Sequence, residues 1–292
     1  MRLSELFASN GAPKISFELF PPRTEKAEAS LGRVVPKLVD LDPAYMTVTY
    51  GALGSTQDKT LGIASKLRNE FNMVTASHFT CVGATKEEID QTLDLILAEG
   101  IDNIVALRGD PPEGEETFTA PEGGFAHANE LVAHIRGRDQ FGIAVAGYPE
   151  KHVEAPSMDS DLAFLKQKVD AGADVVVTQL FYDNADFFRF VEQAQNVGVD
   201  VPIVPGLLPI LSYQQIKKIT SLCGARIPDE LGAQLDAAGD DKEKVFEVGV
   251  SWCEAQAVEL LEQGVPGIHF YVLNRAKHME RIMSSLRQAS LV

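Results

Sequence analysis

Cysteine is scarce in this chain, which has only Cys81, Cys223 and Cys253 among its 292 residues. The three residues are far apart in the sequence, so they form neither a metal-binding spacing nor a disulfide framework. Such sparse cysteine usage is typical of proteins in a reducing compartment. We therefore expect a cytoplasmic protein that is stabilised by its core rather than by cross-links.

Long apolar runs and excess positive charge are also missing. No apolar run approaches the roughly 20 residues that a membrane-spanning helix needs. The N-terminal sequence MRLSELFASNGAPK lacks the apolar core of a secretion signal. The formal net charge is −16, which argues against nucleic acids and anionic membranes as partners. Any anionic ligand therefore needs a locally positive site.

The common nucleotide, nucleophile and metal motifs are absent as well. The chain contains no G-x-G-x-x-G sequence, which argues against a Rossmann dinucleotide site, and no Walker-type Gly-Lys loop. No serine or cysteine stands close to a histidine in a nucleophile motif. No closely spaced set of His, Asp and Glu residues suits a metal, so we expect no metal site.

What the chain does have is a regular alternation of short apolar segments and helical segments. The apolar segments start about 30 residues apart in most cases, which is the size of a βα unit. They are apolar runs, as expected for parallel strands that are buried on both faces. The expected strands are 14–19, 45–49, 73–79, 103–107, 142–146, 174–179, 202–205 and 267–270.

Helical periodicity and capping residues fill the intervals between these strands. The best example begins after Thr85, has Glu87 and Glu88 in its first turn, and ends at Gly100. Two helices before the last strand are additional to the alternation. The expected helices are 27–41, 59–70, 86–99, 123–138, 159–171, 184–197, 212–223, 229–237, 243–263 and 274–286.

This order of elements predicts an α/β protein that forms a single (β/α)8 TIM-type barrel, with extra helices before the last strand. We expect residues 1–292 to form one catalytic barrel domain, because no composition shift or low-complexity linker divides the chain. An open Rossmann-type sheet is the alternative.

Polar side chains gather where the expected strands end, which is where a barrel builds its active site. The fourth strand runs into Arg108, Gly109 and Asp110, and two prolines stop any continuation. Glu18 and His78 lie at the ends of the first and third strands. Each residue alone is explained equally well as a solvated turn or a core histidine, but the complete set predicts an active site.

The kinds of side chain in this set narrow the chemistry. Two carboxylates, Glu18 and Asp110, stand beside neutral hydrogen-bonding groups such as Thr49 and Gln179. Aromatic residues and cations complete the set: Tyr50, Tyr148, Phe181, Arg108, Lys168 and Arg275. This combination suits a large planar cofactor that carries the redox chemistry while a carboxylic acid transfers a proton.

A series of motifs then resembles a known family along essentially the whole chain. The motifs, in order, are FELFPPR (17–23), TVTYGA (47–52), SHFTC (77–81), LRGDPP (107–112), GYPEKH (147–152), DAGADVVVTQLFYD (170–183), PGLLP (205–209) and HFYVLNRA (269–276). Each is weak alone, but the ordered set is specific. Together they resemble the bacterial 5,10-methylenetetrahydrofolate reductases.

The resemblance implies an FAD-dependent barrel of one-carbon and methionine metabolism. It would reduce 5,10-methylenetetrahydrofolate to 5-methyltetrahydrofolate by a ping-pong mechanism, in which NAD(P)H reduces the flavin and leaves before folate binds. By the same resemblance, Glu18 would be the general acid, and a raised pKa would suit that role. Asp110 would be the second catalytic residue, next to the flavin and the pterin.

The resemblance also assigns binding residues. Lys168 would help to neutralise the FAD pyrophosphate, and Thr49 would also contact the nicotinamide. The implied FAD contacts are Thr49, Tyr50, Ala52, His78, Arg108, Gly109, Asp110, Ala128, Tyr148, His152, Ala155, Asp161 and Lys168. The implied substrate contacts are Thr49, Gln179, Gln215 and Arg275, with Arg275 suited to a glutamate-tail carboxylate.

Three residues depart from the family pattern. Phe164 replaces an Asn and Gln167 replaces an Arg at the nucleotide end of the FAD site, and Ile219 stands where an aromatic contact is expected. These differences concern the nucleotide end and the substrate-stacking surface rather than the flavin-ring site.

Two other functions fit parts of the pattern. A non-redox folate-binding barrel that transfers a methyl or methylene group would keep Asp110, Gln179 and Arg275. It would have no use for the set around Arg108, Tyr148 and Lys168. A non-catalytic folate- or flavin-binding protein would not need the acid Glu18.

The remaining expectations rest on the resemblance alone. It favours NADH, although the sequence does not decide between NADH and NADPH because no Rossmann reporter position exists here. It suggests a homo-oligomer. The regulatory domain of eukaryotic relatives is expected to be absent.

Overall fold

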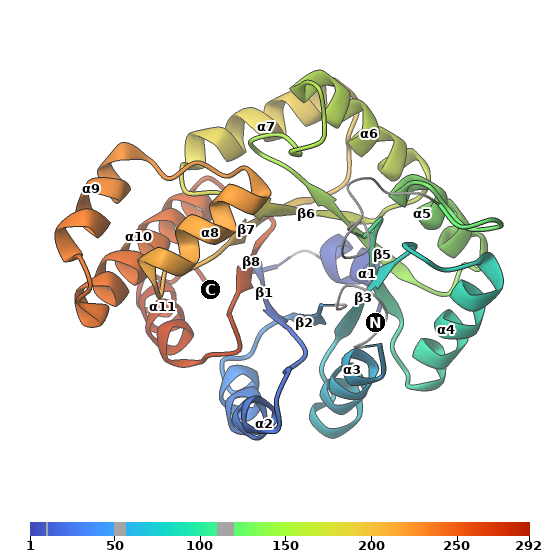
Figure 1. Ribbon diagram of the computed structural model, residues 1–292, viewed down its shortest axis with the longest axis horizontal. Helices are drawn as coiled ribbons and strands as arrows, with labels where there is room; N and C mark the ends of the chain where they lie inside the picture. Colours follow the sequence, from blue (N-terminus) through green and yellow to red (C-terminus); the bar gives the residue numbers. More distant parts are fainter. Residues whose placement is uncertain (10, 50–56, 110–119) are drawn as a thin grey trace.

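Eight parallel strands close into a barrel in chain order, with β1 also paired to β8 (Figure 1). The computed structural model describes residues 1–9, 11–49, 57–109 and 120–292. The barrel prediction is therefore confirmed, and the open-sheet alternative is wrong. The strands are β1 (Lys14–Leu19), β2 (Tyr45–Val48), β3 (Thr75–Thr80), β4 (Asn103–Leu107), β5 (Gly142–Gly147), β6 (Val175–Leu180), β7 (Ile203–Leu207) and β8 (Gly267–Tyr271).

Helices surround the barrel, and the interval between β7 and β8 contains three of them in the described residues. The extra helices predicted before the last strand are thus confirmed. The helices are α1 (Leu3–Ala8), α2 (Glu25–Val39), α3 (Gln57–Phe71), α4 (Lys86–Ala98), α5 (Ala128–Gly137), α6 (Met158–Asp170), α7 (Asn184–Asn196), α8 (Tyr213–Cys223), α9 (Asp229–Ala238), α10 (Lys242–Glu262) and α11 (Lys277–Gln288).

Local sequence signals explain how well individual helix ends were predicted. The start of α4 matches, because Thr85 and Glu88 form a reciprocal capping box. The start of α5 was placed five residues too early. Gly123 has a φ of 76°, which breaks the helix there. The carboxylate of Glu130 instead accepts hydrogen bonds from the backbone amides of Ala126 and His127, which fixes a later start.

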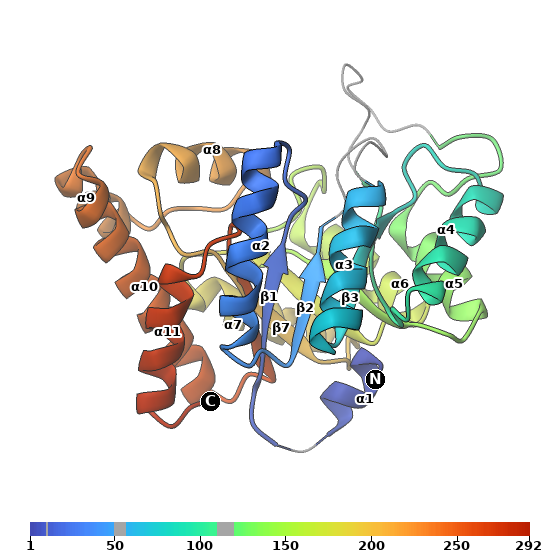
Figure 2. The same ribbon diagram turned by 90° about the horizontal axis from the view of Figure 1, so that it is seen from below.

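The helix α1 was not predicted, and it closes the N-terminal end of the barrel. In Figure 2 it lies below the barrel, while the arrowheads of β1 and β2 point away from it. Leu3 and Leu6 are buried in a cluster with inward-facing strand residues such as Val105 and Val175. Buried Asn103 of β4 accepts a 2.7 Å hydrogen bond from the backbone amide of Leu3. Any site inside the barrel must therefore open at the other end.

Successive residues along each strand alternate between two environments. Residues such as Phe17, Met46 and Ile143 belong to the apolar core that the surrounding helices share with the strands. The neighbouring positions of β1, β2, β3 and β8 carry polar groups into the barrel. In the β1–β8 register, Ser16 pairs with His269 and Glu18 pairs with Tyr271. Alternation therefore builds a polar sector inside an otherwise apolar barrel.

Two negative predictions concern the covalent and membrane state. All three cysteines are free thiols, so the expectation of no disulfide framework is confirmed. Within the described ranges, no helix combines the length and apolar character that crossing a bilayer requires.

Candidate active site

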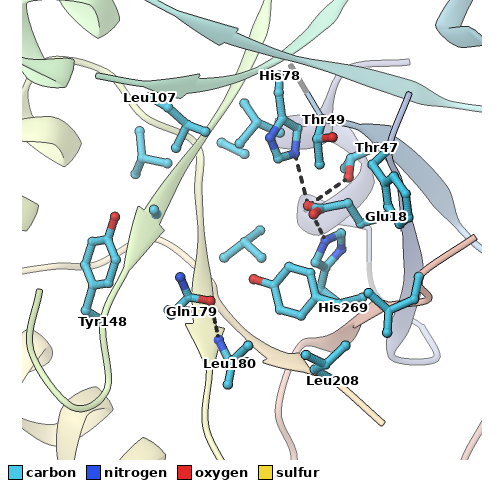
Figure 3. A pocket seen from close by; sticks show the side chains of 18 of the residues that line it. Glu18, Thr47, Thr49, His78, Leu107, Tyr148, Gln179, Leu180, Leu208 and His269 are labelled. Atoms are coloured by element: carbon cyan, nitrogen blue, oxygen red, sulfur yellow. Dashed lines mark hydrogen bonds and ion pairs between the residues drawn. The ribbon is translucent and has the colours of Figure 1, made fainter. Parts of the chain in front are cut away.

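A cavity of about 380 Å³ opens at the C-terminal end of the barrel (Figure 3). Its walls are largely aliphatic and aromatic, and its polar groups come from several strands and the residues that follow them. This is the position at which TIM barrels place their active sites. The polar lining residues are Glu18, Tyr45, Thr47, Thr49, His78, Tyr148, Gln179, His269 and Tyr271.

Glu18 is the centre of a hydrogen-bonded cluster at one side of this cavity (Figure 3). Its Oε2 atom lies 3.1 Å from Nε2 of His78 and 3.3 Å from Nε2 of His269. The hydroxyl of Thr47 donates to the same oxygen at 3.4 Å. Strands β2, β3 and β8 thus each place one group on the carboxylate that β1 supplies.

The ionisation of Glu18 differs from the prediction. A raised pKa was expected, but the pKa of Glu18 is lowered from 4.5 to about 2. Burial alone would raise the pKa, but the charges and hydrogen bonds of His78 and His269 outweigh it. The sequence indicated a buried carboxyl but not its imidazole partners, since they are more than 50 residues away. The carboxylate form therefore predominates in this arrangement.

His269 connects Glu18 to a second polar layer deeper in the barrel. Its Nδ1 atom lies 2.8 Å from Oγ of Ser16, and its ring stacks on Tyr45 at 6.3 Å. The ring of Tyr271 meets it edge-on at 5.2 Å. Ser16 and Tyr45 were not predicted to belong to the site, and the contact between His269 and Glu18 was not predicted either. The signal was available, because Ser16 and Glu18, like His269 and Tyr271, are two apart on one strand face.

Tyr148 and Gln179 lie across the cavity from Glu18 (Figure 3). Tyr148 follows β5, and its ring makes an edge contact with His152 at 4.6 Å. Gln179 belongs to β6, and its Oε1 accepts a hydrogen bond from the amide of Leu180. Thr49 also lines the cavity, and its amide donates to Leu19 at the end of β1. Five of the predicted site residues thus line the same cavity: Glu18, Thr49, His78, Tyr148 and Gln179.

Arg108 and Gly109 directly follow the end of β4. Gly109 has a φ of 93°, and a Cβ atom there would lie 2.6 Å from Val82, so only glycine fits. The guanidinium of Arg108 forms a paired contact with Glu154, with the shorter bond at 2.6 Å.

Lys168, His152 and Asp161 form a partly buried polar group behind Tyr148. Nζ of Lys168 donates to the carbonyl of Ala146 at 2.6 Å, and the pKa of Lys168 is lowered to about 8 by burial, partly offset by Asp161. The carboxylate of Asp161 accepts from the amide of His152 at 2.9 Å. Burial also lowers the pKa of His152. The backbone amide of buried Ala155 donates a hydrogen bond to the carbonyl of His152, which closes this loop.

The departures from the family pattern at 164 and 167 gather beside the start of α5. Phe164 is 49% exposed and stacks on His127, the residue before Ala128, with ring centroids 6.5 Å apart. Gln167 accepts a hydrogen bond from Asn129. Both substitutions therefore alter one small surface, which includes the predicted contact Ala128.

The other predicted substrate residues lie outside the cavity wall. Ile219 of α8 lines the cavity, and Gln215 lies one turn earlier on the same helix, exposed. Arg275 is exposed in the segment between β8 and α11. Tyr50, Ala52 and Asp110 lie outside the described residues. Among the residues that are described, no three His, Cys, Asp or Glu side chains are placed to hold a metal ion.

Comparisons with known proteins show relatives along most of the chain. The chain is 43% identical over 287 residues to methylenetetrahydrofolate reductase (NADH) 1 of Arabidopsis thaliana, covering 94% of this chain and 48% of that protein. It is 38% identical over 276 residues to the 5,10-methylenetetrahydrofolate reductase of Escherichia coli, covering 94% and 91%. The chain thus spans about half the length of the plant relatives it matches.

Solved structures show the same fold at low identity. A Clostridium thermocellum protein, described as binding two copies of 5-methyl-5,6,7,8-tetrahydrofolic acid, matches with a TM-score of 0.67 and 17% identity over 98% of each chain. A sequence model of the family described as methylenetetrahydrofolate reductase matches residues 2–287. Because this match covers nearly all residues, the chain belongs to the methylenetetrahydrofolate reductase family.

Proposed function

We propose that this barrel reduces 5,10-methylenetetrahydrofolate to 5-methyltetrahydrofolate with NAD(P)H as reductant and FAD as cofactor, acting as one catalytic unit over residues 1–292. The observation that carries the proposal is the buried Glu18 cluster in the cavity at the C-terminal end of a barrel of this family. A carboxyl group surrounded by proton-carrying partners suits a reaction that consumes a proton.

The cavity has the character that a flavin ring needs. Its apolar walls, the ring of Tyr148 and the hydrogen-bonding groups of Thr49, His78 and Gln179 suit a flat ring with polar edges. Lys168 and Arg108 supply positive charge near it, in a chain whose net charge is −16. Bound FAD would supply the hydride chemistry, which the side chains of the cavity do not provide.

The side chains of the chain have separate tasks in this proposal. Glu18 delivers a proton to the folate nitrogen that the methylene bridge leaves. Thr47 orients the carboxylate through its hydroxyl. Gln179, across the cavity, hydrogen-bonds the polar edge of the bound substrate, after releasing its Oε1 from the Leu180 amide.

Two residues outside the cavity would contact the parts of folate that extend beyond it. Gln215 lies one turn before the cavity-lining Ile219 on α8, and this position suits a contact at the cavity mouth. Arg275 is exposed and suits a carboxylate of the glutamate tail.

Asp110 remains part of the proposal from the sequence alone. We favour NADH because the plant relatives carry it in their names. A cytoplasmic location and a homo-oligomeric state also belong to this proposal.

The visible spectrum of the purified protein tests the proposal directly. With FAD supplied, the protein should be yellow and should bleach when NADH is added without oxygen. Adding methylenetetrahydrofolate should restore the colour, which would demonstrate both half-reactions in one cuvette. A protein that binds no flavin even when it is supplied would overturn the proposal. The non-redox folate barrel would then be the better assignment.

A further inference from the structure

We infer that His269, supported by Ser16, holds the proton that Glu18 passes to folate, so that His269 is a positioning residue for the acid step. The inference rests on the proposed function and adds to it the source of the proton. It comes from the hydrogen-bonded chain Ser16–His269–Glu18, in which consecutive polar atoms lie 2.8 and 3.3 Å apart.

The reaction itself requires such a source. NAD(P)H provides a hydride, which forms the new C–H bond of the methyl group. The carbon–nitrogen bond of the methylene bridge breaks, and the nitrogen that is released must form an N–H bond. One proton is therefore consumed in each turnover, and it comes from the solvent by way of a protein group. Glu18 must acquire this proton before it can deliver it.

The surroundings of Glu18 keep this proton on a partner rather than on the carboxylate. Oε2 of Glu18 faces two imidazoles, and they favour the ionised carboxylate. In the inferred pathway, the proton resides on His269 before folate binds. When the bridge nitrogen becomes basic beside Glu18, the proton can move from the imidazole through the carboxylate to that nitrogen.

Ser16 makes His269 suitable for this task, because a hydroxyl both donates and accepts hydrogen bonds. When His269 is neutral, the hydroxyl of Ser16 donates to Nδ1. When His269 is protonated, Nδ1–H donates to the hydroxyl, which can turn toward the carbonyl of Ile268 at 3.5 Å. Both protonation states therefore keep their hydrogen bonds without any movement of the backbone.

His269 also differs from His78 in being enclosed within the barrel, which keeps its proton from direct exchange with the solvent. The side chain of His269 is 1% exposed, compared with 12% for His78. The titratable groups that face His269 in the described part of the barrel are Glu18 on β1, Tyr45 on β2 and Tyr271 on its own strand, with His78 on β3 beyond Glu18. Burial raises the pKa of both tyrosines, so they stay neutral.

The Ser16→Ala variant provides the first test. Protonated His269 would lose its Nδ1 acceptor, so the pH at which it gives up its proton should fall. In rapid-mixing experiments, the folate half-reaction should slow about tenfold on the alkaline side of the wild-type profile if the midpoint moves by one pH unit. The two rates should converge at acidic pH. The NADH half-reaction should be unchanged, and Ser16→Thr, which keeps the hydroxyl, should restore the wild-type profile.

Two controls and a second readout separate this role from a structural one. Ser77→Ala removes another buried strand hydroxyl, and His134→Gln removes the imidazole that pairs with Asp90 on the outside of the barrel; both should leave the profile unchanged. In the ligand-free protein, ¹⁵N NMR of the imidazole nitrogens should show the His269 titration moving to lower pH in Ser16→Ala.

The outcomes are distinct. If Ser16→Ala leaves both the profile and the His269 titration unchanged, the inference is wrong. If that variant does not fold, His269→Gln decides, because it keeps an N–H for Glu18 but holds no proton, and it should slow only the folate half-reaction, by about 100-fold. A wild-type protein that reduces no folate would refute the proposed function instead, and the NMR titration would still test the Ser16–His269 pair.

Discussion

Glu18 illustrates how the position of a single residue fixes chemistry that its type leaves open. A carboxylate at a strand end is normally solvated, but here one oxygen atom faces His78, His269 and Thr47. Two of these partners are histidines, whose charge changes near neutral pH. The Glu18 carboxyl, whose pKa these partners lower to about 2, carries no proton of its own at neutral pH, so under the proposed function it must receive the proton from a partner.

Replacement of this carboxylate should separate the two half-reactions. Glu18→Gln keeps the size and a hydrogen-bonding side chain but cannot deliver a proton. Folate reduction should fall by about 10²- to 10⁴-fold, the usual contribution of a general acid. NADH oxidation with an artificial acceptor should continue at the parent rate. A variant that still reduced folate at the parent rate would show that Glu18 is not the acid.

Lys168 predicts a pH dependence of cofactor binding. Its pKa in the free protein is about 8, because burial disfavours the ammonium form. A bound pyrophosphate would favour the ammonium, so binding takes up a proton when the pH is above about 8. FAD affinity should therefore be constant below that pH and fall above it, by up to about tenfold for each pH unit.

Flavin fluorescence titrations at pH 7 and pH 9 check this dependence. Lys168→Met, which has no titrating group, should bind FAD more weakly at pH 7 and show little change between the two pH values. Equal pH dependence in the parent and Lys168→Met would assign the effect to another group.

The sequence predicted one part of this site and missed another for a physical reason. Glu18, Thr49, His78, Tyr148 and Gln179 were found because they stand where apolar runs end. Ser16 was missed, and His269 was not connected to Glu18, because both lie inside strands, where a polar residue is usually a satisfied core group. Only the register between β1 and β8, which closes the barrel, brings them together.

At the scale of elements, the segment after β8 is held in an unusual backbone conformation. Leu273 and Asn274 have φ values of 49° and 52°, a left-handed region that leucine rarely adopts. Asn274 holds the turn by accepting from the amide of Phe20 at 3.1 Å and donating to its carbonyl at 2.8 Å. Leu273 and Phe20 both line the cavity, so this pair of bonds shapes its wall.

Removing these bonds should therefore affect both stability and folate binding. Asn274→Ala loses two hydrogen bonds and a residue that tolerates left-handed backbone, which should cost about 1–2 kcal/mol in urea unfolding. The KM for folate should rise. Asn72→Ala is the matched control, since Asn72 is also left-handed, with a φ of 51°, but lies outside the cavity wall. If its KM rose equally, the effect would be one of general stability.

Most elements could be predicted because the hydrophobic periodicity and the capping residues agree. The start of α5 and the helix α1 could not. The start of α5 depends on the carboxylate of Glu130, which accepts hydrogen bonds from the amides of Ala126 and His127, whereas the helical pattern of the sequence begins earlier. The six residues of α1 are too few to show a period, and the helix is stabilised by burial against the barrel rather than by its own sequence.

At the scale of the whole molecule, the two ends of the barrel have different roles. The C-terminal end carries the polar cluster, while α1 and Asn103 close the other end with apolar contacts and a buried hydrogen bond. Changes at the closed end should therefore alter stability without altering the chemistry.

Leu3→Ala tests this separation. Leu3 is fully buried, so its truncation should lower the free energy of unfolding by about 2–5 kcal/mol, as measured by urea denaturation. At 25 °C the folate-reduction kcat of the folded variant should stay within about twofold of the parent. Leu95→Ala, at a position that is 56% exposed, should change stability by less than about 0.5 kcal/mol. A lower kcat with unchanged stability would contradict this division.

Closure by α1 also determines how molecules exchange. The cavity lies at the C-terminal end, so under the proposed function the spent nicotinamide would leave by the side from which folate arrives. Under the proposed function, the two substrates cannot enter from opposite ends of the barrel and must compete for one entrance. Steady-state rates at fixed NADH should therefore rise and then fall as folate increases, and extra NADH should relieve this inhibition. In the cell, the ratio of the two substrates, rather than the amount of either, would then set the throughput of the enzyme.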